Sequence, residues 1–275
     1  MSTELVWLIT GTTSGLGREM AIAALNRGDK VIATGRNMSS GKCEDLRSRG
    51  ADLIELDVTA PLPAIQEIAQ RAVSLYGKVD VLINNAGYAE LGTLEETTVN
   101  VFGPLNVARV FLPYMRQRKT GTIVFVGSVT GWRASPYSGL YSSTKWSLRG
   151  LSETLHEEIS PLGLRSICID FGYFRTPMLQ PGRRQERVER IVDYKEIVDA
   201  QEERLQRTDG NQPGDPVKAA EVVISIVRGE GVAAGKPFPN SLALGTDCYV
   251  TAKASAEKAL TRLNDWREAS SSTDF

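Results

Sequence analysis

A tyrosine and a lysine four residues apart are the residues of this chain best suited to move a proton: Tyr141 and Lys145, in Tyr141-Ser142-Ser143-Thr144-Lys145. If the stretch is helical, both side chains lie on one helix face. A fixed positive charge favours the phenolate, so Lys145 is expected to lower the tyrosine pKa from its reference near ~10, which would make it an efficient acid at neutral pH. Alone, the pair is equally an ordinary helix-surface pair, so the surrounding sequence must decide.

Two alternating patterns predict the elements that would position this pair. Short, continuous apolar runs rich in β-branched residues are typical of strands covered on both faces. They span residues 5–10, 30–34, 52–56, 79–83, 121–126 and 164–169. Segments of helical period lie between them, including 15–27, 61–76, 105–118 and 141–159. The alternation predicts an α/β fold: a doubly wound parallel sheet with helices on both faces, Rossmann-like, in a single domain over residues 1–275.

The last third of the chain is predicted to form a substrate lid and a C-terminal helix. Residues 183–207 combine dense charges of both signs with apolar residues at helical spacing, which predicts an amphipathic helix within a substrate lid at 178–212. Asp215 followed by Pro216 has the pattern of an N-cap with proline at the first helical position. A short edge strand is expected at 242–244 and a C-terminal helix at 247–268.

Composition narrows the class of function. The formal net charge of -1 offers no basic surface for nucleic acid or anionic lipid. Three dispersed cysteines and a single histidine provide no metal-ligand spacing, so no metal site is predicted, and the cysteines suit a reducing compartment. The N-terminal apolar run is too short for a signal peptide or a membrane span. We therefore expect a cytoplasmic protein without a membrane or nucleic-acid partner.

A glycine-rich turn follows the first predicted strand and opens the first predicted helix. In doubly wound sheets, ligands bind beyond the carboxyl ends of the strands. Glycines permit a tight turn and close backbone approach, while the helix N-terminus attracts phosphate. The expected cofactor-binding residues of this turn are Gly11, Thr13, Ser14, Gly15, Leu16 and Gly17.

Later strand ends add residues that suit a dinucleotide. Arg36 follows the second strand, where a carboxylate would favour NAD and an arginine suits the 2′-phosphate of NADP. After the third strand Asp57 and Val58 are placed to meet an adenine edge, although Asp57 could equally cap the next helix. After the fourth strand a groove lining is expected from Asn84, Asn85, Ala86 and Gly87.

Together these motifs resemble the short-chain dehydrogenase/reductase family over residues 4 to about 177. The resemblance implies a catalytic set of Ser128, Tyr141 and Lys145, with Asn100 as a fourth member that holds a proton-relay water. It also places Gly172, Phe174 and Thr176 at the cofactor. Two features depart from the family pattern: Phe171 stands where a proline is usual, and few residues separate Gly87 from Asn100.

Aromatic and methionine side chains flank the catalytic set and predict the character of the substrate. By the same resemblance the substrate pocket is expected to contain Ser128, Trp132, Tyr137, Phe171, Tyr173 and Met178. Such side chains favour a bulky apolar or aromatic molecule. Each of these rings could instead be part of the core.

The chemistry expected from these residues is NADP(H)-dependent hydride transfer between nicotinamide and a ketone or secondary alcohol. Tyr141 would donate the proton, Ser128 would bind the carbonyl oxygen, and Lys145 would tune Tyr141 and hold the ribose. Two alternatives stay open: a non-redox enzyme of the same fold, such as an epimerase or dehydratase, and a non-catalytic NADP-binding sensor or scaffold. The sequence also leaves a homo-oligomer open.

Overall fold

The structure is a computed structural model that describes residues 4–38, 41, 43–87, 100–180, 183 and 191–275. Its centre is one seven-stranded parallel sheet with the strand order β3-β2-β1-β4-β5-β6-β7. The order reverses between β1 and β4, so the fold is the predicted doubly wound, Rossmann-like sheet. The strands are β1 (Val6–Thr10), β2 (Lys30–Gly35), β3 (Asp52–Glu55), β4 (Val81–Asn84), β5 (Gly121–Ser128), β6 (Leu164–Phe171) and β7 (Ser241–Leu244).

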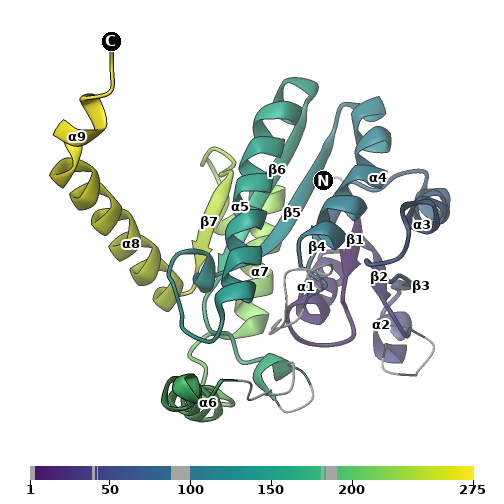
Figure 1. Cartoon of the computed structure of the whole chain (residues 1–275). Helices are drawn as coiled ribbons and strands as arrows, with labels where there is room; N and C mark the ends of the chain where they lie inside the picture. The colour runs from purple at the N-terminus through teal and green to yellow at the C-terminus, as the bar shows by residue number, and fades with distance from the viewer. Residues whose placement is uncertain (1–3, 39–40, 42, 88–99, 181–182, 184–190) are drawn as a thin grey trace.

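Helices cover both faces of the sheet, and a separate apolar core fills each interface (Figure 1). One core joins the sheet to α1 (Gly15–Asn26), α2 (Glu44–Ser48) and α7 (Pro216–Arg228). The other joins it to α3 (Leu62–Tyr76), α4 (Phe102–Arg118) and α5 (Gly139–Ile159). Successive residues of one strand serve opposite cores: Leu8 packs toward α3 and α4, whereas Ile9 packs toward α1. This two-sided burial explains why the strands read as continuous apolar runs.

The two longest strands extend further than the sequence predicts. β5 ends at Ser128 and β6 at Phe171, and their register pairs these two residues. The extension comes from pairing between the strands, because Gly127, Ser128 and Asp170 have little strand preference of their own. As a result Ser128 stands on the rigid end of a central strand.

The C-terminal third differs from its prediction in two details, the start of its first helix and the form of the closing helix. A helix is found over α6 (Lys195–Thr208), but residues 192–194 form a 3-10 turn, and 184–190 lie outside the described residues. Asp215 caps α7 by accepting hydrogen bonds from the backbone of Val217 and Lys218, as predicted. The predicted closing helix is two helices, α8 (Thr246–Asp265) and α9 (Arg267–Ser271).

α8 and α9 extend away from the sheet, and α6 lies below the main body in the same view (Figure 1). Within the part of the chain that the structure describes, no helix combines the length and apolar character that crossing a membrane requires.

Candidate active site

The glycine-rich turn between β1 and α1 lies at the switch point of the sheet, and its glycines are required by close approach. Gly11 has φ +74, which favours glycine, and a Cβ on it would lie 2.9 Å from the Cα of Ala86. A Cβ on Gly17 would lie 2.5 Å from the Gly11 carbonyl oxygen. Leu16 packs against the core below α1. The turn therefore holds its backbone in place and leaves Thr13, Ser14 and Gly15 on its outer side.

The segment after β4 ties this turn to the middle of the sheet. The side-chain amide of Asn85 donates to the carbonyl oxygens of Thr10 (2.8 Å) and Gly11 (3.1 Å). The Thr10 hydroxyl in turn accepts hydrogen bonds from the backbone of Asn85 and Ala86. Asn84 is buried beside them, and its side-chain amide has no hydrogen-bond partner within the described residues.

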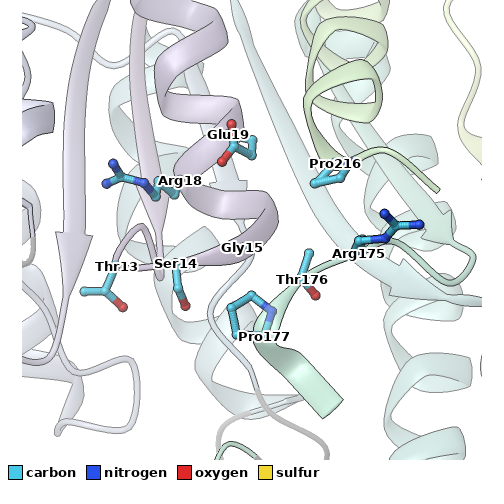
Figure 2. Close-up of a pocket in the computed structure, with 9 residues that line it drawn as sticks. All are labelled: Thr13, Ser14, Gly15, Arg18, Glu19, Arg175, Thr176, Pro177 and Pro216. Carbon is cyan, nitrogen blue, oxygen red and sulfur yellow. The ribbon is translucent and has the colours of Figure 1, made fainter. Parts of the chain in front are cut away.

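A cleft of about 450 Å³ separates the turn from the chain after β6 (Figure 2). Thr13, Ser14 and Gly15 form one side, and Thr176 lies across from them, its Cβ 3.5 Å from where a Cβ of Gly15 would be. Among the described residues no side chain caps the first turn of α1 through Ser14, so its amide hydrogens stay available. An open helix N-terminus beside a glycine turn fits the pyrophosphate of a dinucleotide. The unpartnered amide of Asn84 offers a further polar contact.

The residues predicted to contact the adenosine half lie at the ends of β2 and β3. Arg36 is exposed, and its charge contributes to lowering the pKa of Asp57, so the two side chains lie near each other. Thr59 lowers the pKa of Asp57 most: its backbone N–H (2.9 Å) and its hydroxyl (2.7 Å) both donate to that carboxylate. Asp57 therefore closes a local turn before α3 and does not cap that helix, whose N-cap is Pro61. Val58 is buried against Gly103 at the start of α4.

Ser128, Tyr141 and Lys145 come together at the ends of β5 and α5. Lys145 is only 7% exposed, and its ammonium donates a 2.8 Å hydrogen bond to the carbonyl oxygen of Val126. The same nitrogen lies 5.6 Å from the centre of the Tyr141 ring, which the i,i+4 spacing on α5 explains. The Ser128 hydroxyl faces Tyr141 as a hydrogen-bond donor, and its oxygen accepts two bonds from Thr130.

The pKa of Tyr141 differs from the expectation based on Lys145. Burial raises the pKa of Tyr141 to about 12, hydrogen bonding with Ser128 acts against that rise, and the nearby Tyr173 and Asp170 add to it. The ammonium of Lys145 lies beside the ring and bonds to Val126, and it does not bring the pKa of Tyr141 below its ordinary value. In the protein alone, Tyr141 is thus a protonated phenol at neutral pH.

Asn100 lies beside the segment that follows β4. It is 1% exposed, and its side-chain oxygen would lie 2.7 Å from a Cβ on Gly87. The chain between these two residues lies outside the described residues. The structure thus brings Asn100 to the mid-sheet motif, and its part in a proton relay stays a prediction.

Two of the predicted aromatic residues are structural. Phe171 is buried in the core on the α1 and α7 side, and its ring meets that of Phe174 edge to face at 5.6 Å. Phe174 also covers Gly214, where a Cβ would lie 2.5 Å from its ring. The expected pocket role of Phe171 is therefore corrected to core packing. Alternation along β6 explains this, because Phe171 follows Ile167 and Ile169 on the α7 face.

The other residues predicted for the substrate pocket are Trp132, Tyr137, Tyr173 and Met178. Tyr173 lies close enough to raise the pKa of Tyr141, and Met178 is 37% exposed in the turn that follows. Trp132 donates its indole N–H to Asp170 at 2.8 Å. The Tyr137 hydroxyl donates to Glu202 on α6 at 2.8 Å. These contacts leave Tyr173 and Met178 as the residues most open to a substrate.

Three charged residues that hold the backbone around the site were not predicted from the sequence. Asp170 and Arg149 form a buried ion pair beside Ser128, and Asp247 at the start of α8 accepts the backbone N–H of Tyr173 at 2.7 Å. Asp170 could have been found from the sequence, because it directly follows the apolar run 164–169 and a carboxylate there is expected to be buried with a partner. Arg149 and Asp247 carry no comparable signal, because charged residues on helices are ordinarily exposed.

The switch-point cleft, the glycine turn and Tyr141 beside the buried Lys145 are features of a dinucleotide-binding α/β protein. Residues 5–187 match the family profile described as short chain dehydrogenase. The chain therefore belongs to the short-chain dehydrogenase/reductase family.

Individual relatives agree with this assignment. The chain is 32% identical to Oxidoreductase BOA17 of Botryotinia fuckeliana over 96% of its own length and 97% of that protein's. It superposes on a short-chain dehydrogenase from Streptomyces avermitilis with a TM-score of 0.84 at 34% identity, covering all of both chains. Actinorhodin polyketide ketoreductase with NADPH gives a TM-score of 0.70 at 28% identity, over 89% of this chain and 97% of that one. Structures of this fold at 21–23% identity hold NAD in one case and NADPH or NADP in others. The chain is an oxidoreductase of this family.

Proposed function

We propose that this oxidoreductase uses NADP(H) to interconvert a ketone and a secondary alcohol of a fairly bulky, apolar or aromatic small molecule. The observation that carries the proposal is the convergence of Ser128, Tyr141 and Lys145 at the carboxyl end of β5. A half-buried phenol held beside a hydroxyl and an ammonium is an arrangement for general acid–base chemistry.

Each residue has a stated task. Bound NADP(H) supplies or accepts the hydride. Thr130 donates two hydrogen bonds to the Ser128 oxygen, at 3.2 Å and 3.1 Å, so both lone pairs of that oxygen are occupied. The Ser128 hydroxyl hydrogen is therefore the part of the group that donates, toward Tyr141 in the protein alone and toward the substrate oxygen once a substrate is bound. Tyr141 gives its proton to the same oxygen during reduction and takes it back during oxidation.

The preference for NADP(H) rests on Arg36. No carboxylate follows β2, and the exposed Arg36 can pair with a 2′-phosphate. The pyrophosphate would lie against the first turn of α1, between Ser14 and Thr176. Gly172 would leave the backbone free to approach the nicotinamide, and Asn100 would hold the relay water.

The substrate character rests on the apolar surroundings of Tyr141. Tyr173 lies beside Tyr141, Met178 is exposed in the turn that follows, and α6, linked to Tyr137 through Glu202, would form part of a substrate lid. We also propose a reducing, cytoplasmic compartment, because all three cysteines are buried free thiols.

Cofactor titration and a ketone panel test the proposal. NADPH and NADH are titrated by fluorescence, and NADPH oxidation is then followed with ketones of increasing size. Tyr141→Phe serves as the variant that removes the proton donor. We expect tighter binding of NADPH, turnover of bulky aromatic ketones, and a loss of ~10² to 10⁴ in rate in the variant with cofactor affinity preserved. Cofactor binding without turnover of any ketone would favour the sensor or a non-redox enzyme.

A further inference from the structure

The carboxylate of Asp170 is the most heavily bonded buried charge beside the catalytic set. The residue is 0% exposed, and one of its oxygens accepts the backbone N–H of Ser128 at 3.1 Å. The other accepts the Trp132 indole N–H at 2.8 Å and two N–H groups of Arg149 at 3.2 Å and 3.1 Å. Both oxygens are thus engaged with the chain around Ser128.

Arg149 completes the attachment from α5. Its guanidinium donates a 2.5 Å hydrogen bond to the carbonyl oxygen of Gly131 and lies 3.6 Å from the centre of the Trp132 ring. Because Asp170 and Arg149 together hold Ser128, Gly131 and Trp132, both ends of the segment 128–132 are bonded. We refer to Asp170, Arg149 and Trp132 as the Asp170 network.

Neighbouring glycines make room for the network. A Cβ on Gly127 would lie 2.0 Å from the Asp170 carboxylate, and one on Gly131 would lie 3.2 Å from the Arg149 guanidinium. The carboxylate therefore approaches the backbone of β5 more closely than any larger residue at position 127 would permit.

The network consists of a buried ion pair with directional hydrogen bonds, which suits positioning of the backbone better than stabilisation of the fold. A buried ion pair is often no more stabilising than apolar residues of similar volume, because both charges lose hydration. Directional bonds, however, fix the backbone to which they attach. Here the bonds of Asp170 and Arg149 attach to Ser128 at one end of the segment 128–132 and to Gly131 and Trp132 at the other.

We propose that the Asp170 network positions the Ser128 hydroxyl for the substrate oxygen. The inference rests on the proposed function, and Asp170, Arg149 and Trp132 are positioning residues that act through Ser128. Trp132 accordingly supports the pocket wall with its indole N–H already engaged.

A second buried aspartate provides a matched control. Asp29 accepts bonds from the Trp7 indole (2.8 Å), the Leu5 backbone (3.0 Å) and Arg228 (2.8 Å). This is the same combination of partners, placed before β1 and β2 at the opposite end of the sheet. Loss of either aspartate should destabilise the fold, but only loss of Asp170 should affect chemistry.

The experiment compares Asp170→Asn, Arg149→Met and Trp132→Phe with Asp29→Asn. Single-turnover hydride transfer is measured per cofactor-binding site, with unlabelled cofactor and with cofactor deuterated at the transferred position. We expect Asp170→Asn and Arg149→Met to slow this step about 10- to 100-fold with a larger isotope effect. Cofactor affinity should change by less than about two-fold, and Asp29→Asn should keep the wild-type rate. If Asp170→Asn does not fold, Trp132→Phe, which removes the indole N–H and part of the ring against Arg149 but keeps the Asp170–Arg149 pair, is expected to slow the step about 3- to 10-fold.

Amide hydrogen exchange of residues 128–132 supplies a readout independent of turnover. We expect faster exchange there in Asp170→Asn and unchanged exchange in Asp29→Asn. Wild-type rates per binding site in all three network variants would overturn the inference, even if exchange accelerates. A wild-type protein that turns over no ketone, with exchange altered as expected, would instead count against the proposed function and leave the attachment of the segment supported.

Discussion

The ammonium of Lys145 lies 5.6 Å from the centre of the Tyr141 ring while it donates a 2.8 Å hydrogen bond to the carbonyl oxygen of Val126. This bond holds α5 to β5 at the point where Tyr141 meets Ser128. Lys145 therefore has a structural task in the chain itself, in addition to the ribose contact that the family resemblance implies.

Lys145→Met should accordingly lower both activity and stability. Loss of the buried donor leaves the Val126 carbonyl without this bond, which costs about 1–3 kcal/mol of unfolding free energy. Ketone reduction should fall at least ~10²-fold, because the ribose contact and the placement of Tyr141 are lost together. Thermal unfolding and NADPH oxidation measure the two effects. If Lys145→Met lowers stability but keeps wild-type ketone reduction, Lys145 has a structural role only.

Arg36→Asp should weaken NADPH binding more than NADH binding. The exposed guanidinium is proposed to pair with the 2′-phosphate, and a charge-assisted pair of this kind contributes about 10- to 100-fold in affinity. Arg49→Asp makes the same charge change at an exposed residue after α2 and serves as the control. Equal losses for both cofactors, or the same loss in the control, would remove Arg36 from the phosphate site.

The contact between Tyr137 and Glu202 should control access under α6. Tyr137 has φ +69, an uncommon backbone conformation for a residue other than glycine, and its hydroxyl donates to Glu202 at 2.8 Å. Tyr137→Phe and Glu202→Ala should each raise KM for bulky ketones about 3- to 10-fold, with little further change in the double variant. Glu203→Ala, on the same helix and paired with Arg207, is the control. Additive effects would show that the two residues act separately.

Gly172→Ala should destabilise the protein, whereas Gly150→Ala should stabilise it. A Cβ on Gly172 would lie 1.9 Å from the Asp247 carboxylate, which holds the Tyr173 backbone, so a methyl group there costs about 1–3 kcal/mol. Gly150 lies within α5 with open space around its Cα, and alanine should add about 0.5–1 kcal/mol. Chemical denaturation measures both. A neutral Gly172→Ala would mean that α8 moves freely from the strand end.

Stability should fall at alkaline pH partly because of Cys248. Burial, followed by the nearby charges of Asp170 and Asp247, raises the pKa of this thiol to about 12 from 9.0. The unfolded thiol loses its proton first, so the folded state is favoured below pH ~9 and loses that advantage as pH rises toward ~12. Cys248→Ser should reduce the slope of unfolding free energy against pH in this window by about one proton. An unchanged slope would contradict the raised pKa.

The sequence alone determined the parts that depend on local chemistry. Continuous apolar runs, typical of strands buried on both faces, predicted a parallel sheet. Glycines after the first strand predicted a tight turn that only small residues permit. The spacing of Tyr141 and Lys145 placed them on one helix face, and Asp215 was correctly identified as a cap. These properties arise within a few residues, so they can be read from the chain.

Only the tertiary structure decided which side chains lie around the catalytic residues. Pairing of β5 with β6 extended both strands and turned Phe171 into the core, while Asp170, on the opposite face, was brought against Ser128. Burial then raised the pKa of Tyr141 to about 12, against the effect expected of Lys145. The face of the strand on which a side chain lies, its burial and its distant neighbours all depend on how the elements pack. These properties cannot be read from neighbouring residues in the sequence.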